Sequence, residues 1–124
     1  MFASLISFLL LFTSPNADVS VAPSKVVWLT EQDHDFGEIQ QNHPVKFVFQ
    51  YKNSSDAPLT LETVRTTCGC TAAQWTETPV APGGTGEIAV EYDAYQGGGF
   101  KKKIRVFFVE QKKAEILWIR GDTH

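Results

Sequence analysis

Two cysteines, Cys68 and Cys70, are separated by Gly69 alone, and they are the residues of this chain best suited to chemistry. In an exported protein a disulfide is the usual fate of such a pair. Residues i and i+2 of a strand lie about 6.6 Å apart with parallel side chains, which is too far for a disulfide. A Cys68–Cys70 bridge therefore requires a tight turn, and Gly69 would allow that turn by adopting a positive φ.

A ring this small would stabilise the fold only slightly. Closing a loop of about three residues contributes ~1.6 kcal/mol, against ~3 kcal/mol for a loop of about 15 residues. A strained local disulfide is also comparatively easy to reduce, which is typical of redox-active pairs. We favour a disulfide or thiol pair that shapes a loop, with thiol–disulfide exchange and binding of Cu(I) or Zn(II) as the alternatives.

The histidines give little support to a metal or catalytic site. The chain has three, His34, His43 and His124, and we expect His34 and His43 in or beside loops. Together with Cys68 and Cys70 they are weak candidates for metal ligands, because a closed zinc site needs four ligands. No nucleophile with a neighbouring base can be recognised. We therefore predict no catalytic residue and no cofactor, and an enzyme only if the cysteine pair exchanges disulfides.

The segments that must position the cysteines have the two-residue periodicity of strands. Apolar side chains recur at every second position in residues 45–52 and again in residues 86–93, as in strands with one buried and one wet face. Residues 59–64 begin with the same alternation and lose it near Val64, which suggests a bulge. With the turn-forming clusters between them, about seven short strands result. The sequence predicts an all-β, antiparallel immunoglobulin-like sandwich over residues 25–124.

The sequence also predicts how deeply two tryptophans are buried. Trp75 follows the cysteine loop, and we expect it to be partly exposed and to support that loop together with Gly69 and Thr71. Trp118 lies within a nearly continuous apolar segment, and we expect it in the core.

Two charged segments receive structural interpretations. Residues 33–35 (DHD) are expected to form a turn that leads into Phe36 as a core anchor, with Gly37 bending the backbone. Residues 101–105 (KKKIR) are expected to be a solvated strand face and not a phosphate-binding patch.

The N-terminal segment predicts the compartment. Apolar residues 5–12 have the length of a signal-peptide core and are too short to span a bilayer. We expect a signal peptide at residues 1–17, with cleavage at residue 22 as the alternative, and a secreted or periplasmic protein without a stable membrane anchor after cleavage. The formal net charge is −3 and the pI is near 5.5, which argues against a nucleic-acid-binding protein.

The chain resembles a family of secreted bacterial domains, domain-of-unknown-function family fifteen-seventy-three. The resemblance is carried by the segments HDFGEI, VKFVFQYKNSSDAPLTLETV, CGCTAAQW, PVAPGGTGEIAVEYD, GGGFKKKIRV and LWIRG, in the family's order. It implies an immunoglobulin-like sandwich similar to major-sperm-protein and Hydin domains, in a Gram-negative envelope, and it implies no known activity. Glu110 stands where a turn residue such as Asn would be expected.

These inferences together predict a binding module. An exported immunoglobulin-like sandwich recognises proteins through the loops at one end or through an edge strand. We expect a protein partner that meets the Cys-Gly-Cys loop, and no nucleic acid. A thiol–disulfide redox protein that uses Cys68 and Cys70 is the alternative, and a periplasmic copper- or zinc-binding protein is the second alternative.

Overall fold

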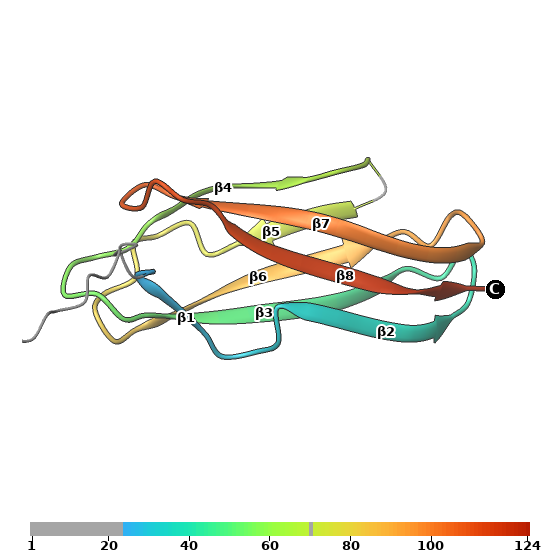
Figure 1. The fold of residues 1–124 in the computed structure, drawn as a ribbon, viewed down its shortest axis with the longest axis horizontal. Coiled ribbons are helices and arrows are strands. Elements are labelled where there is room, and N and C mark those ends of the chain that lie inside the picture. The colour runs from blue at the N-terminus through green and yellow to red at the C-terminus, as the bar shows by residue number, and fades with distance from the viewer. Residues whose placement is uncertain (1–23, 70) are drawn as a thin grey trace, which may run out of the picture.

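The chain folds as a sandwich of two four-stranded sheets (Figure 1). The computed structural model describes residues 24–69 and 71–124. The predicted signal peptide, residues 1–17, and the cleavage positions at 17 and 22 lie outside the described residues. The strands are β1 (Val26–Trp28), β2 (Asp33–Ile39), β3 (Val45–Asn53), β4 (Leu61–Thr66), β5 (Thr71–Trp75), β6 (Thr85–Tyr92), β7 (Gly98–Phe108) and β8 (Glu115–Thr123).

The strand order confirms an immunoglobulin-like sandwich and adds one strand to the predicted seven. One sheet has the order β1-β3-β6-β5 and the other the order β2-β8-β7-β4. Neighbouring strands are antiparallel except for β2 and β8, which are parallel. No helix in the described part of the chain is long and apolar enough to cross a membrane.

The additional strand is β2, which contains the three residues predicted to form a turn. That prediction was wrong because the polarity of residues 33–35 was taken as a turn signal. Arg120 on β8 pairs with Asp33 (2.8 Å) and Asp35 (3.2 Å), so these carboxylates are compatible with a strand at the sheet edge. The expected bend at Gly37 is present, since its φ is 71° and the β2–β8 register shifts between Asp35 and Glu38. Phe36 packs against the core, as predicted.

The core forms where the inward faces of the two sheets meet. Alternate residues of β6 and of the second half of β3 are buried, as the periodicity predicts, whereas Val45 and Phe47 at the start of β3 are partly buried. The buried residues pack against alternate residues of β7 and β8. The fully buried members are Phe49, Tyr51, Ile88, Val90, Ile104, Val106, Leu117 and Ile119.

Trp118 does not belong to this core. Its neighbours Leu117 and Ile119 are fully buried, so the alternation of the strand turns Trp118 to the outer face of the sheet. There its ring lies below the ammonium groups of Lys101 and Lys103, at 4.7 and 5.8 Å. The prediction failed because β8 carries apolar residues on both faces, and periodicity alone does not separate them.

Each sheet contains a glycine covered by an aromatic ring on the neighbouring strand. Tyr51 is the cross-strand partner of Gly86, and Phe100 is the partner of Gly121. A Cβ atom at Gly86 would overlap the Tyr51 ring, and one at Gly121 would lie 2.9 Å from Phe100. Large rings can therefore fill the core at these positions only because the partner residue has no side chain.

The predicted bulge in β4 is present slightly earlier than expected. The register of β4 against β7 shifts between Leu61 and Thr63, and Val64 has already returned to regular pairing with Val106.

Candidate functional site

The cysteine loop lies at one end of the sandwich with two other connections. The β2–β3, β4–β5 and β6–β7 connections all gather at the end that holds the C-terminus (Figure 1). Backbone and side-chain contacts join two of them: Asn42 donates its backbone N–H to the carbonyl of Ala94 (2.8 Å), and the Gln41 side chain donates to the carbonyl of Tyr95 (2.9 Å). Loops at one end of such a sandwich are the usual place for recognition.

Hydrogen bonds fix the start and end of the cysteine loop. The Thr66 hydroxyl lies within hydrogen-bond distance of the carbonyl oxygens of Cys68 (3.3 Å) and Thr71 (3.2 Å). Thr71 donates its backbone N–H to the carbonyl of Cys68 (3.4 Å), and its hydroxyl lies 3.8 Å from the Cys68 sulfur. Thr71 is buried, and these contacts place it against the loop for which the sequence predicts it to be a support.

The redox state of the pair stays a prediction. No cysteine in the described part of the chain is a free thiol. The disulfide itself would involve residue 70, which lies outside the described residues.

Gly69 differs from its predicted role. It is exposed, its φ is outside the left-handed region, and a Cβ atom built on it would meet nothing within 4 Å. The expectation that a positive φ at Gly69 makes the turn was therefore wrong. At this end of the molecule the left-handed conformation is found instead at Asn42, with a φ of 65°, in the β2–β3 connection and at Ala94, with a φ of 56°, in the β6–β7 connection.

A cavity of about 210 Å³ separates the cysteine loop from the β6–β7 loop; its lining residues are Cys68, Tyr92, Asp93, Tyr95, Gln96 and Lys102. Tyr95 is 70% exposed, and its backbone N–H donates to the side chain of Asp93 (3.0 Å). Burial, with a smaller contribution from the charge of Asp93, raises the pKa of Tyr92 above its ordinary value. The cavity is therefore lined by a cysteine, a lysine and two tyrosines.

Sequence reasoning found the turn 95–99 but missed that Tyr95 and Lys102 face the cysteine loop. Thr71 and Tyr92 are register partners in adjacent strands, and this pairing is what brings the two loops together. A single sequence contains no signal for such a pairing.

The other predicted site residues lie elsewhere. Trp75 is at the opposite end of β5 from Thr71, where it packs against the core. Four residues of strand separate it from the loop by about 13 Å. It is half-buried, in line with partial exposure, but it does not support the cysteine loop.

The histidines are not assembled around the cysteine loop. His34 lies in β2, not in a loop, where it stacks on Phe47 at 3.7 Å and contacts Glu31 at 3.2 Å. β2 and β4 are the opposite edges of their sheet, so His34 is remote from Cys68. His43 is in the β2–β3 connection as expected, and its ring contacts the carbonyl of Gln41 (3.1 Å). Within residues 24–69 and 71–124, no group of three His, Cys, Asp or Glu side chains could hold a metal ion.

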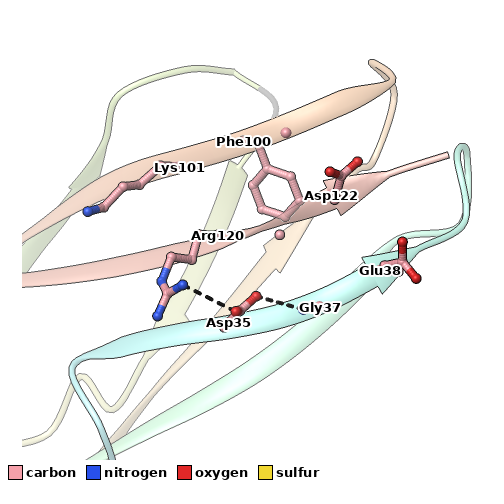
Figure 2. Close-up of a pocket in the computed structure, with 9 residues that line it drawn as sticks. Asp35, Gly37, Glu38, Phe100, Lys101, Arg120 and Asp122 are labelled. Atoms are coloured by element: carbon pink, nitrogen blue, oxygen red, sulfur yellow. Dashed lines mark hydrogen bonds and ion pairs between the residues drawn. The ribbon is translucent and has the colours of Figure 1, made fainter.

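A second hollow lies on the outer side of β2, β8 and β7 (Figure 2). This trough of about 590 Å³ is lined by Asp35, Gly37, Glu38, Gly99, Phe100, Lys101, Arg120, Gly121 and Asp122. Three glycines on adjacent strands leave the backbone uncovered, while the Phe100 ring turns inward and stacks on the buried Tyr92 at 4.0 Å. Asp35 accepts a hydrogen bond from the backbone of Gly37 (2.8 Å), which holds the bulge of β2 at the rim.

The electrostatics of the trough are largely internally compensated. A hydrogen bond to Asp33 and the charges of Asp33 and Asp35 raise the pKa of Arg120. Asp122 and Glu38 lie near the ring of His124, at 3.8 and 2.9 Å. The cysteine end, with its exposed Tyr95 and half-buried Lys102, is therefore the stronger candidate for a recognition site.

Comparison with known proteins agrees with the fold. A family model described as a protein of unknown function (DUF1573) matches residues 27–123. No curated protein is significantly similar to this chain.

Among solved structures, a protein of unknown function from Porphyromonas gingivalis W83 is similar with a TM-score of 0.67 at 17% identity, over 78% of this chain and 46% of that one. The VesB protease of Vibrio cholerae is similar with a TM-score of 0.68 at 18% identity, over 80% of this chain and 32% of that one.

A PapD-like domain of human CEP192 is similar with a TM-score of 0.65 at 8% identity, over 89% of this chain and 98% of that domain. At these identities the likeness concerns the fold alone. This chain spans less than half the length of the first two of these proteins.

Proposed function

This chain belongs to the family of proteins of unknown function DUF1573, and from that premise we propose that it is an exported protein-binding module that recognises its partner at the cysteine end of the sandwich. The observation that carries the proposal is the exposure of Tyr95 at 70%, beside the cavity that it shares with Cys68 and Lys102. Tyrosine is enriched at binding hot spots, and charge beside an aromatic ring favours a polar protein surface.

The rigidity of this end supports the same role. The Thr66 and Thr71 contacts hold the cysteine loop, and the hydrogen bond that the Tyr95 backbone N–H donates to Asp93 orders the backbone there. A loop that is ordered before binding loses less conformational entropy when it meets a partner. A Cys68–Cys70 disulfide would add to this rigidity, which is the role we propose for the pair.

Export is part of the proposal and rests on the apolar residues 5–12 followed by small residues at 17 and 22. Intact-mass analysis of the protein recovered from the cells that make it tests this. We expect the mass of a chain that begins after residue 17 or 22, whereas the mass of an unprocessed chain would contradict export through a cleaved signal.

Site-directed photocrosslinking in those cells tests the recognition site. A photoreactive aromatic residue at position 95 should give one adduct of discrete mass, and the same residue at Gln74, which is exposed on β5, should not. Tyr95→Ala should remove binding of the crosslinked partner once it is purified, while Val109→Ala, which truncates another exposed apolar side chain, should not. Equal crosslinking from both positions, or no effect of Tyr95→Ala, would remove the proposal.

Thiol–disulfide exchange is the second candidate function, because Lys102 lines the same cavity as Cys68. A nearby cation stabilises a thiolate, which is the nucleophile in exchange. Alkylation followed by mass analysis over a graded redox buffer separates the two functions. If the cysteine pair is reduced at a mild potential, and if that potential shifts in Lys102→Gln, exchange is favoured. If the pair resists reduction, a fixed element of a binding loop is favoured.

A further inference from the structure

One outer surface of the sandwich has an excess of positive charge. Three cations of β7 point outward because they alternate with its buried residues: Lys101, Lys103 and Arg105. Arg65 on β4 points the same way because it is the register partner of Arg105. We call these four cations, with the aromatic residues Trp118 and Phe107 beside them, the basic face. The chain as a whole has a net charge of −3, so this charge is segregated to one side.

Three of the four cations of the basic face rest on aromatic rings. Lys101 and Lys103 lie above the Trp118 ring, and the guanidinium of Arg65 lies 5.5 Å from the centre of the Phe107 ring. At exposed sites such contacts contribute about 0.5–1 kcal/mol each. They hold long, flexible side chains in place while leaving the charges accessible to a partner.

The register places like charges opposite one another on this face. Arg65 is the cross-strand partner of Arg105, and Lys101 is the partner of Arg120. Directly opposite like charges destabilise a sheet. Arg120 is compensated by Asp33 and Asp35, but within the described residues none of the four cations of the basic face has a carboxylate within ion-pair distance.

Three residues of the basic face have a regular backbone spacing along β7. Lys101, Lys103 and Arg105 are alternate residues of β7, so their Cα atoms recur about every 6.6–6.8 Å. A second extended chain with an acidic residue at every other position has the same repeat.

From the spacing, the uncompensated charge and the cation–aromatic contacts, we infer that the basic face binds an extended acidic peptide segment of a protein partner, with carboxylates aligned along β7. Each carboxylate would lie over one of these cations and relieve the repulsion between Arg65 and Arg105. The aromatic rings already order three of the four cations, which reduces the entropic cost of binding.

Other anionic partners fit this surface less well. The Trp118 and Phe107 side chains are half-buried beneath cations, so they do not protrude for insertion into a lipid bilayer. The same cations cover the ring faces on which a sugar would stack. An overall acidic chain with four uncompensated cations is also poorly suited to a nucleic acid.

Fluorescence anisotropy with two labelled peptides tests the inference. One peptide alternates glutamate with serine, and the other has the same composition with its glutamates in a single block. The alternating peptide should bind more tightly than the block peptide. Its affinity should fall steeply as salt is raised to about 0.5 M, because salt then screens the attraction between opposite charges beyond a few ångströms.

A matched pair of double variants locates the site. Lys103→Gln/Arg105→Gln removes two charges from the basic face, and Lys46→Gln/Lys52→Gln removes two from exposed positions of the opposite sheet. The first should weaken binding about tenfold and the second less than about twofold. The substituted residues of both variants lie on the outer faces of strands and outside the core, so each variant should fold. Circular dichroism checks this.

The inference is independent of the cysteine end, so Tyr95→Ala should bind the alternating peptide as well as the unaltered chain does. No binding at low salt, equal binding of the two peptides, or equal losses in the two double variants would overturn it. Tighter binding of polygalacturonate or of phosphatidylglycerol vesicles at equal charge would also overturn it, since the surface would then serve a different class of partner. Salt-sensitive self-association that Lys103→Gln/Arg105→Gln abolishes would assign the face to a second copy of the chain instead.

Discussion

The outer faces of the two sheets are built from similar strands but distribute charge in different ways. On the β3–β6 face, Lys46 is the register partner of Glu91, and Gln50 donates a hydrogen bond to Glu87 (3.1 Å). On the β7–β4 face, Arg105 is the partner of Arg65. The first arrangement is what stability alone would favour. The second keeps a repulsive pair, which is more readily understood as a surface prepared for an anionic partner.

The inner faces, in contrast, use the same device in both sheets. A ring on one strand, Tyr51 or Phe100, covers a glycine on the next, Gly86 or Gly121. Packing therefore imposes one solution on both halves of the core, whereas the outer faces are free to diverge.

Adding a methyl group at the covered glycines should give the largest effect. Gly86→Ala would place a Cβ atom inside the contact distance of the fully buried Tyr51 ring, and Gly121→Ala would place one 2.9 Å from both Phe100 and the carbonyl of Gly37. We expect each to lower the free energy of unfolding by about 2–3 kcal/mol. Chemical denaturation measures this.

Gly69→Ala is the control, because its Cβ atom would meet open space, and it should change the free energy of unfolding by less than about 0.5 kcal/mol. If Gly86→Ala or Gly121→Ala were tolerated as well as Gly69→Ala, the two inner faces would not share this constraint.

The two covering rings differ in the hydroxyl group that Tyr51 has and Phe100 lacks, and its removal should change the stability of the fold. Within the described residues this buried hydroxyl has no hydrogen-bond partner, so Tyr51→Phe should raise the free energy of unfolding by about 1 kcal/mol near neutral pH. A loss of stability in urea denaturation would show that the hydroxyl is satisfied.

The same hydroxyl predicts an alkaline loss of stability. Burial raises the pKa of Tyr51 to about 12 from 10.0, so the folded state keeps a proton that the unfolded state releases. The free energy of unfolding should therefore decline from about pH 10 to about pH 12. The decline should be smaller in Tyr51→Phe, though still present, because burial also raises the pKa of Tyr92. Equal declines in both proteins would contradict this assignment.

Charge reversal on the two outer faces should have small effects of opposite sign. Arg105→Glu would place an acid opposite Arg65 and raise the free energy of unfolding by about 0.5 kcal/mol at low salt. Glu91→Lys would place a cation opposite Lys46 and lower it by a similar amount. Thermal denaturation at low and high salt measures both, and both should disappear at high salt. The same sign for the two variants would mean that the faces do not differ in their electrostatics.

The sequence predicts those parts of the fold that are encoded locally. The alternation in β3 and β6 identifies Phe49, Tyr51, Ile88 and Val90 as core residues, and all four are fully buried. It fails at Trp118, because in β8 both faces are apolar and the lysines that cover the ring lie on another strand.

The same limit applies to β2 and to the candidate site. Asp33 and Asp35 are acceptable in a strand only because Arg120 compensates them, and the local sequence does not contain that arginine. The cysteine pair identifies one side of the candidate site, whereas Tyr95 and Lys102 reach it through strand pairing.

The position of β8 has a consequence for how the chain folds. β8 lies in the middle of its sheet, between β2 and β7, and it is parallel to β2. The ion pair between Asp33 and Arg120 joins residues 87 positions apart. Contacts this distant in sequence slow folding to the millisecond-to-second range that is typical of all-β domains. During synthesis β2 therefore stays unpaired until nearly the whole domain has been made. Throughout that time its backbone N–H and C=O groups are accessible to chaperones or to other chains.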